Sequence, residues 1–338
     1  MTITEPTKPL AISLGDPAGI GPEIIARAWT AREDARLAPF FVAGGRNVLT
    51  QVAREMDADI PIIAIEDVAD ATAAFEDGLP VLGAPGCSWR PGEPDTEGAQ
   101  LGYDSLKWAT ALAREGLAGG LVTGPIAKAR LAEVGFSHPG QTEFVAYACG
   151  VDPGDAVMML AGPSLRTVPI TVHVPLADVP RLLSAELIER RAAIVARALR
   201  DDFGIAAPRL AITALNPHAG EEGRMGGEEN AIIAPAVAAL RARGIDATGP
   251  HPADALFAAR SRENFDVAIC MYHDQALIPL KTLDFDEGVN VTLGLPVIRT
   301  SPDHGTAFGI AGKGLAHPGA MIAAIRMAGK CAARRSRS

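Results

Sequence analysis

The chain has 338 residues, of which 48% are hydrophobic and 21% are charged, and its 35 glycines and 26 prolines stay below the share typical of low-complexity chains. This length suits one large α/β unit or two lobes, and it excludes a peptide-scale binding motif. The net charge of −9 argues against a nucleic-acid partner, because nucleic-acid binders usually present a basic face.

The sequence predicts a cytoplasmic protein without a membrane partner. No uninterrupted apolar stretch reaches about 18 residues, the length that spans a bilayer. The first residues, Met1–Pro9, are polar and include an acidic residue and two prolines, unlike a secretory leader. The cysteines are far apart in sequence and form no C-x-x-C pair, which favours a reducing compartment.

Eight short apolar runs are predicted as strands, and longer helical patterns alternate with them. The runs are apolar on both faces, which is typical of a parallel sheet covered by helices. The predicted strands are Leu10–Asp16, Phe40–Gly44, Pro61–Ile65, Gly120–Pro125, Ala156–Gly162, Val168–Val174, Arg209–Asn216 and Asp266–Asp274. Helices are predicted at Glu97–Leu117 and Ala185–Phe203, and a long loop at Gly83–Gly98. The fold class is therefore α/β with a mostly parallel sheet.

The first predicted strand runs directly into the segment GDPAGIGPEI, residues 15–24. Its Pro22 and Glu23 suit the first turn of a helix. Its glycines, at 15, 19 and 21, do not form G-x-G-x-x-G, so no Rossmann fingerprint is present. The pattern fits a substrate-facing loop and fits a plain tight turn equally well.

Three histidines lie at or just beyond the ends of predicted strands: His173, His218 and His273. Imidazole is the commonest metal ligand, and three of them leave one coordination position open, as catalytic sites do. Each histidine alone is more often a core or surface residue, and the spacings of 45 and 55 residues form no local motif. Their shared placement nevertheless predicts one metal site assembled from separate strands.

The stretch from His273 to Gly314 is the densest polar part of the chain. Within it, Lys281, Asn290 and Arg299 follow one another at nine-residue spacing around a predicted apolar strand, VNVTLGL. The guanidinium fork and the ammonium group suit phosphate oxygens, and the amide adds a neutral donor, so a small phosphorylated substrate fits. Solvated surface charge is the alternative reading.

Several further residues carry weaker signals. Gln141 and Thr142 stand at a predicted helix start, where they could donate hydrogen bonds to an anion. Lys128, early in another helix, could assist proton transfer or could simply be solvated. Asp274 could orient the neighbouring imidazole, act as a base or cap a turn. The acidic run at 216–229 fits either metal ligands or a polar loop that enters a helix near residue 228.

The chain resembles the PdxA family, the 4-hydroxythreonine-4-phosphate dehydrogenases of pyridoxine biosynthesis. The resemblance covers residues 10–328 and rests on the segments GDPAGIGPEI, TGPIAK, GQTEFVA, ALNPHAGEEGRMGGEE, PADALF, MYHDQALIPLK and GVNVTLGLPVIRTSPDHGTAFGIAGKG. The first and last segments are also similar to the isocitrate and isopropylmalate dehydrogenase class. That class shares the fold and uses NAD(P) without a Rossmann motif.

This resemblance implies roles for the residues singled out above. It implies that the three histidines, His173, His218 and His273, bind a divalent metal ion, with zinc, magnesium and cobalt as the candidates. It implies that substrate is bound by Gln141, Thr142, Lys281, Asn290 and Arg299. Catalytic candidates are Asp274 and Lys128. Candidates for binding NAD or NADP are Asp303, His304, Gly305, Thr306, Gly312 and Lys313.

One position departs from the family. The family usually has His-Thr where this chain has Gln141-Thr142. A glutamine can still donate a hydrogen bond, but it cannot become cationic. The departure therefore leaves open the affinity for phosphate there and its dependence on pH.

The resemblance also implies a two-lobed, isocitrate/isopropylmalate dehydrogenase-like α/β/α fold. The expected lobes are a cofactor-side lobe of residues 1–127 and 290–338, and a metal, substrate and dimer-interface lobe of residues 128–289. The protein is expected to be a homodimer whose active site draws on both subunits.

The implied reaction is the NAD(P)-dependent, metal-dependent oxidation of 4-phosphohydroxy-L-threonine to 2-amino-3-oxo-4-phosphooxybutanoate. This 3-oxo acid then loses carbon dioxide to give 3-amino-2-oxopropyl phosphate. An alternative substrate is 4-phospho-D-threonate or 4-phospho-D-erythronate, because related dehydrogenases share most of these motifs. A more remote alternative is a phosphate acyltransferase, which uses a related architecture.

Overall fold

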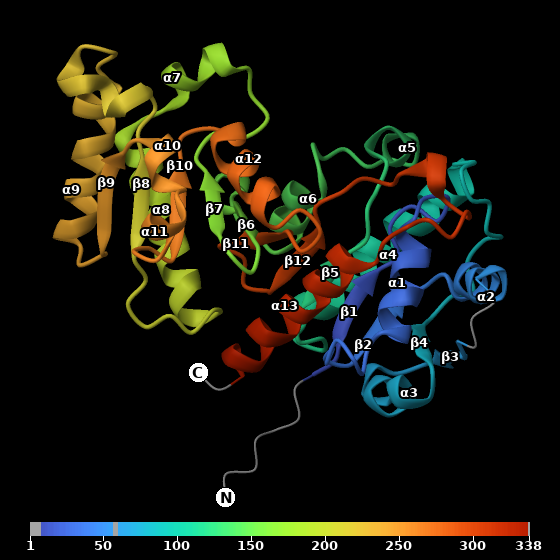
Figure 1. Ribbon diagram of the computed structural model, residues 1–338. Coiled ribbons are helices and arrows are strands. Elements are labelled where there is room, and N and C mark those ends of the chain that lie inside the picture. The colour runs from blue at the N-terminus through green and yellow to red at the C-terminus, as the bar shows by residue number, and fades with distance from the viewer. Residues whose placement is uncertain (1–7, 57–59, 337–338) are drawn as a thin grey trace, which may run out of the picture. The chain divides into compact units, whose positions relative to one another are not determined.

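The computed structural model describes residues 8–56 and 60–336 (Figure 1). Two compact units make up the chain: one runs to Pro153 and resumes at Leu295, and the other spans Gly154–Gly294. Each unit is a sheet with helices packed on it, so the predicted α/β class is confirmed. No helix in the described ranges is long and apolar enough to cross a membrane.

The first unit contains an all-parallel sheet in the order β3-β4-β2-β1-β5-β12. Its strands are β1 (Leu10–Ser13), β2 (Phe40–Ala43), β3 (Ile62–Ile65), β4 (Leu79–Leu82), β5 (Leu121–Thr123) and β12 (Arg299–Pro302). Every residue of β1, β2 and β5 is buried, as the apolar runs on both faces predicted. The crossover helices that parallel strands require lie between them in the chain.

The helices of the first unit begin where the sequence supplies the right residues. In α4, the Asp95 side chain caps the helix by accepting a hydrogen bond from the Gly98 N–H. In α1, Pro22 and Glu23 occupy the first turn, as expected. The helices are α1 (Gly21–Thr30), α2 (Arg46–Glu55), α3 (Ala71–Asp77), α4 (Thr96–Arg114), α5 (Lys128–Glu133), α6 (Gln141–Ala148) and α13 (Gly319–Arg335).

The second unit contains a mixed sheet in the order β11-β6-β7-β10-β8-β9. Its strands are β6 (Val157–Ala161), β7 (Arg166–Pro169), β8 (Leu210–Thr213), β9 (Ala247–His251), β10 (Val267–Cys270) and β11 (Val289–Leu293). Strand β6 is antiparallel to β7, because only a short turn joins the two, and it is also antiparallel to β11. The other pairs, β7 with β10, β10 with β8 and β8 with β9, are parallel.

The helices of the second unit are α7 (Val179–Leu182), α8 (Ala185–Asp201), α9 (Ala234–Ala242), α10 (Ala253–Leu256), α11 (Ala259–Arg262) and α12 (His273–Leu283). The Ser184 side chain caps α8 by accepting a hydrogen bond from the Leu187 N–H. The acidic run ends in a π-helical turn at Glu229–Ile233 that leads into α9, which agrees with the expected helix entry near residue 228.

The two units divide the chain differently from the expected lobes. Residues 128–153 belong to the first unit and not to the expected second lobe, because α5 and α6 pack on α4. Strand β11 belongs to the second unit up to Gly294, because it pairs with β6. The sequence also missed β4, β9 and β12, which are short and contain proline, a residue uncommon in strand interiors.

Candidate active site

The three predicted metal ligands leave the sheet of the second unit at one edge. His173 follows β7, His218 follows β8, and His273 follows β10 as the first residue of α12. Strands β7 and β8 both pair in parallel with the central strand β10, so their carboxyl ends lie together. This edge is where ligands bind in open α/β sheets.

His173 and His273 face each other at this edge. Their ring centroids are 5.6 Å apart, with an angle of 43° between the ring planes. Both rings line a cavity of about 230 Å³, together with Thr171, Tyr272 and Asp274. His273 Nδ1 is hydrogen-bonded to Asp274 Oδ1 at 2.7 Å, which leaves Nε2 of the same ring available to a metal ion. The donor chemistry of this pair therefore fits a divalent transition metal.

His218 is exposed and lies in a tight 3₁₀ segment, Pro217–Gly223. Its φ is 53°, and φ is also positive at Ala219, Glu221 and Glu222. The segment therefore has a left-handed backbone conformation, which residues other than glycine rarely adopt. His173 has a φ of 54° as well. Left-handed non-glycine residues concentrate at functional sites, where the surrounding fold holds them.

Within residues 8–56 and 60–336, no group of three His, Cys, Asp or Glu side chains lies close enough to hold a metal ion. The structure thus pairs two of the three predicted ligands, His173 and His273, and His218 does not complete a set with them in this chain.

The two glutamates that end the acidic run, residues 216–229, stabilise the loop that this run forms. Glu229 is buried and accepts hydrogen bonds from the Leu215 and Asn216 N–H groups. Glu228 accepts one from the Asn216 side chain.

Arg299 forms the core of a polar cluster in the first unit. It is 3% exposed, and its guanidinium donates from Nη2 to Thr123 Oγ1 at 2.8 Å and from Nη1 to Thr142 Oγ1 at 3.2 Å. Burial lowers the pKa of Arg299 to about 10, and the Glu143 carboxylate opposes that shift. Arg299 therefore stays cationic at neutral pH inside the protein, where a charge interacts strongly with an anion.

Gln141 and Lys128 border the same cluster. Gln141 Nε2 donates to the Gly124 carbonyl at 3.0 Å, while its buried Oε1 accepts no hydrogen bond from any described residue. A β-carbon at Gly140 would lie 3.6 Å from Lys128 Nζ and 2.9 Å from Glu143 Oε2, so both charged groups flank the start of α6. The helix begins with Gly140 as its cap, not Thr142, which leaves the Thr142 hydroxyl to Arg299.

The remaining substrate candidates belong to the second unit. Asn290 lies in β11, where its buried Oδ1 has no hydrogen-bond partner among the described residues. Lys281 lies in α12 and is half-buried. Buried polar atoms are normally satisfied, so the unmatched oxygens of Gln141 and Asn290 mark places where a ligand donor fits.

The candidate cofactor residues lie in a glycine-rich loop, residues 303–314, which is hydrogen-bonded to α1 and to the turn before it. Ile20 N–H donates to the Thr306 carbonyl at 2.9 Å, and Arg27 Nη2 donates to the Gly314 carbonyl at 3.0 Å. The buried Glu23 carboxylate accepts a hydrogen bond from the Gly312 N–H. A β-carbon at Gly305 would meet nothing within 4 Å, so the backbone there is open to close approach by a ligand.

Sequence reasoning passed over Glu23 and Glu143 as functional residues, although both lie in segments that it singled out. The signal available for each was a carboxylate in the first turn of a helix. That signal has an ordinary explanation in the helix dipole, so it did not point to a contact with a distant loop.

Asp16 follows β1, is 3% exposed and lies in the glycine-rich turn between β1 and α1. Burial raises its pKa above the usual 3.8, and the Ala18 N–H that donates to Oδ1 only partly offsets this. The folded state therefore binds the proton more tightly than the unfolded state. The contribution of Asp16 to stability is therefore full below its pKa in the unfolded state, and it is lost as the pH rises through its pKa in the folded state.

We expect Asp16→Asn to be more stable than the wild type at pH 7.5 and to lose most of that advantage as the pH falls to 3.8, the usual pKa of the aspartate carboxyl. Asparagine keeps the acceptor for the Ala18 N–H and stays neutral at every pH. Urea unfolding of both proteins at the two pH values measures the difference in free energy of unfolding. An equal difference at both pH values would show that ionising the buried Asp16 carboxyl does not lower the stability of the folded protein.

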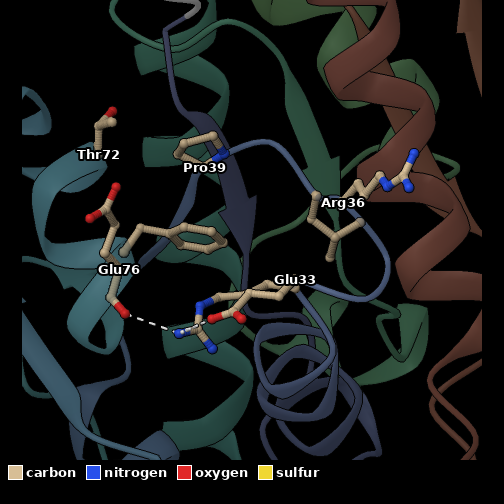
Figure 2. A pocket seen from close by; sticks show the side chains of 8 residues that line it. Glu33, Arg36, Pro39, Thr72 and Glu76 are labelled. Carbon is tan, nitrogen blue, oxygen red and sulfur yellow. Dashed lines mark hydrogen bonds and ion pairs between the residues drawn. The ribbon is translucent and has the colours of Figure 1, made fainter.

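A larger cavity, of about 430 Å³, lies elsewhere in the first unit (Figure 2). It is lined by residues that follow α1, by Pro39 at the amino end of β2, and by one side of α3. Ligand sites of open α/β sheets lie at the carboxyl ends of strands. The guanidinium of Arg32, which lines the cavity, already stacks on Trp29 and donates to the Glu76 carbonyl. This cavity is therefore not the catalytic site.

Comparison with known proteins gives consistent results. A family model described as pyridoxal phosphate biosynthetic protein PdxA matches residues 36–328. A protein from Erythrobacter litoralis (strain HTCC2594), named 4-hydroxythreonine-4-phosphate dehydrogenase, is 63% identical over 332 residues, covering 98% of this chain and 99% of that protein. A protein of the same name from Zymomonas mobilis subsp. mobilis is 51% identical and is covered to 96%, as is this chain.

Solved structures show the same similarity. A crystal structure of 4-hydroxythreonine-4-phosphate dehydrogenase from Klebsiella pneumoniae superimposes with a TM-score of 0.87 at 38% sequence identity. The match covers 96% of this chain and 98% of that one, so it includes both units.

Proposed function

This chain belongs to the PdxA family of pyridoxal phosphate biosynthetic proteins, and from that membership we propose that it oxidises 4-phosphohydroxy-L-threonine with NAD or NADP. It is a dehydrogenase that acts on a CH–OH group. The observation in this chain that carries the proposal is the pair of imidazoles, His173 and His273, 5.6 Å apart beside a cavity at the carboxyl ends of parallel strands.

The reaction converts the C3 hydroxyl of the substrate to a ketone and yields 2-amino-3-oxo-4-phosphooxybutanoate. The nicotinamide of NAD(P) supplies the hydride acceptor. The ketone then stands beside the carbon that bears the carboxylate. Carbon dioxide leaves readily from such a 3-oxo acid, because the electron pair of the broken bond delocalises onto the ketone oxygen. Protonation of the resulting enolate at C2 then gives the product, 3-amino-2-oxopropyl phosphate.

His173, His273 and His218 are the residues that would hold a divalent metal ion. Such a metal supplies Lewis-acid chemistry, lowering the pKa of the substrate hydroxyl and stabilising negative charge on its oxygen. Zinc, cobalt and magnesium are the candidates, and imidazole ligands suit zinc and cobalt better than magnesium. Asp274 orients the His273 ring through its 2.7 Å hydrogen bond, so it fixes which ring nitrogen faces the cavity.

Arg299 and Thr142 are proposed to bind the phosphate of the substrate. Lys281 and Asn290 are proposed as further substrate-binding residues. The support for this is the buried cation of Arg299, whose fork matches phosphate oxygens. Gln141 presents an unmatched acceptor, so it suits a donor group of the substrate such as its ammonium or hydroxyl. We propose Lys128, beside the start of α6, as a proton-transfer group.

The loop of residues 303–314 is proposed to bind NAD or NADP, with Asp303, His304, Gly305, Thr306, Gly312 and Lys313 as the contacting residues. A β-carbon at Gly305 or Gly309 would meet nothing within 4 Å, so the backbone is accessible there, and Lys313 brings a cation to an exposed position. These features suit a negatively charged dinucleotide. We place the reaction in the cytoplasm, because no disulfide joins any two of the four cysteines, all of which lie in the described ranges.

A homodimer with shared active sites is proposed to complete the metal ligand set. Two large apolar side chains of this unit are exposed to solvent: Leu176, which lines the same cavity as the two histidines, at 66%, and Ile278, further along α12, at 62%. Exposed apolar side chains gathered around a site are typical of an interface. A second subunit covering them could supply the ligand that one chain does not bring to the pair.

Mixing single-histidine variants tests the shared site. If the ligands of one site come from two subunits, at least one pair among His173→Ala, His218→Ala and His273→Ala complements when unfolded together and refolded. We expect such a mixture to recover about a quarter of wild-type activity, because half of the dimers are mixed and half of their sites are intact. Inactivity of every mixture, or a monomer by light scattering, would contradict the proposal.

The activity itself is tested by NADH absorbance with and without chelator. The substrates are 4-phosphohydroxy-L-threonine, 4-phospho-D-threonate and 4-phospho-D-erythronate, with acetyl phosphate and coenzyme A as the acyltransferase control. We expect the fastest turnover with the first substrate and its loss after chelation. Faster turnover of either sugar-acid phosphate would reassign the substrate, and acyl transfer without NADH formation would overturn the dehydrogenase assignment.

A further inference from the structure

A buried amide links the strands that carry two of the histidines. Gln275 lies two residues after His273 in the first turn of α12 and is 9% exposed. Its Oε1 accepts hydrogen bonds from the Met271 N–H and the Thr213 hydroxyl, both at 2.7 Å. Its Nε2 donates to the Ala214 carbonyl at 2.8 Å. One side chain therefore joins the end of β10 to the end of β8.

A second contact extends this link to β7. Thr171, which is 5% exposed and lies two residues before His173, donates to the Met271 carbonyl from its hydroxyl at 2.8 Å and from its N–H at 3.2 Å. Met271 in turn precedes His273 by two residues. The residues Thr171, Met271, Gln275, Thr213 and Ala214 form a continuous hydrogen-bonded unit, the strand-end clamp.

The clamp acts where the regular sheet has ended. The pairing of β10 with β8 stops at Ile269 and Ile212, and that of β10 with β7 stops at Cys270 and Pro169. Beyond these pairs, backbone hydrogen bonds still join the β7 segment to the β10 segment, as where Ile170 N–H donates to the Cys270 carbonyl at 2.7 Å, whereas the regular pairing of the β8 segment with β10 has ended. The clamp adds buried side-chain hydrogen bonds at this level, and such bonds are costly to break because a buried polar group that loses its partner is not compensated by water.

We propose that Gln275 is a positioning residue for the metal site, holding the strand ends before His173, His218 and His273 in place through the strand-end clamp, so that each chain presents its imidazoles correctly to a site shared between two subunits. The proposal rests on the metal site described under Proposed function. His173 and His218 both have left-handed φ values, so each ring direction depends on the backbone immediately before it. A shift at Thr171 or Ala214 therefore displaces the imidazole that follows.

The first test replaces Gln275 with leucine, which has similar bulk and no polar atoms. Co²⁺ is the probe, because its visible absorption reports the ligand geometry, and competition with a chelator gives its dissociation constant. We expect the dissociation constant to rise roughly 10- to 100-fold, with an altered Co²⁺ spectrum. The core variant Leu240→Ala in α9 of the same unit should lower Tm without changing Co²⁺ affinity.

Thr213→Val keeps the test decisive if Gln275→Leu does not fold, because valine matches threonine in shape and only the hydroxyl is lost. We expect a rise of about 3- to 10-fold in the Co²⁺ dissociation constant, and recovery to within about twofold in Thr213→Ser, which restores the hydroxyl. A merely structural role would lower Tm in Thr213→Val and leave the affinity and the spectrum unchanged, and that result would overturn the proposal.

The wild-type protein separates this failure from failure of the metal site itself. If the wild type binds no Co²⁺, or if His218→Ala binds it as tightly as the wild type, the three-histidine site is refuted. The clamp then has no ligands to position, and the proposal is overturned with it. If the wild type binds Co²⁺ through the histidines and the clamp variants bind it equally well, only the role of Gln275 is refuted.

Discussion

His218→Ala is expected to abolish tight metal binding and to lower kcat by at least about 100-fold. Two imidazoles, His173 and His273, already face each other, and a third ligand is needed for a site with a single open position. Metal content after dialysis and steady-state turnover at saturating substrate measure the two effects. Both should fall together, because the proposed alcohol activation depends on the bound ion.

His251→Ala is the matched control for this prediction. It removes an imidazole of the same unit that is hydrogen-bonded to Thr248 and lies outside the proposed ligand set. This variant should keep its metal and its turnover. Unchanged turnover in His218→Ala, or equal metal loss in both variants, would rule out the assignment of His218.

Arg299→Ala is expected to weaken binding of the phosphorylated substrate by about 2–4 kcal/mol, or roughly 30- to 700-fold, and to change the KM for NAD(P) much less. Arg299 is buried and cationic, so its loss removes a charge from a place where water cannot replace it. The loss also deprives the hydroxyls of Thr123 and Thr142 of their donor. Isothermal titration with substrate, with cofactor and with inorganic phosphate measures the difference.

Two variants show whether the fork or the charge of Arg299 is needed. Arg299→Lys keeps the charge and loses the fork, so it should recover only part of the affinity. Arg209→Ala breaks an ion pair with Asp266 in the second unit and should leave substrate binding unchanged. Equal weakening of substrate and cofactor in Arg299→Ala would point to a folding defect in place of a lost phosphate contact.

The elements that could be predicted from the sequence are those whose signals are local. The apolar runs at Leu10–Ser13 and Leu210–Thr213 are buried on both faces, so their composition alone indicates parallel strands. The helix starting at Thr96 has a capping aspartate in the sequence. Strands such as β9 and β12 are short and contain proline, and only their neighbours in the sheet make them strands.

The candidate site was likewise only partly predictable from the sequence. The residue types suited to a metal ion and a phosphate could be picked out from the sequence, because imidazole, guanidinium and amide chemistry belongs to each side chain wherever it lies. Whether His173 meets His273, and that Arg299 meets Thr123 and Thr142, depends on strands far apart in the chain. No local pattern encodes those contacts.

For this protein, the sequence by itself determined the α/β class, the family and the chemical character of the candidate residues, since each depends on composition and short motifs. Only the tertiary structure decided that Gln275 ties β10 to β8, that Glu23 fastens the loop of residues 303–314, and that residues 128–153 pack with the first unit. The physical reason is that these outcomes depend on which strand ends and helices become neighbours after the chain has folded.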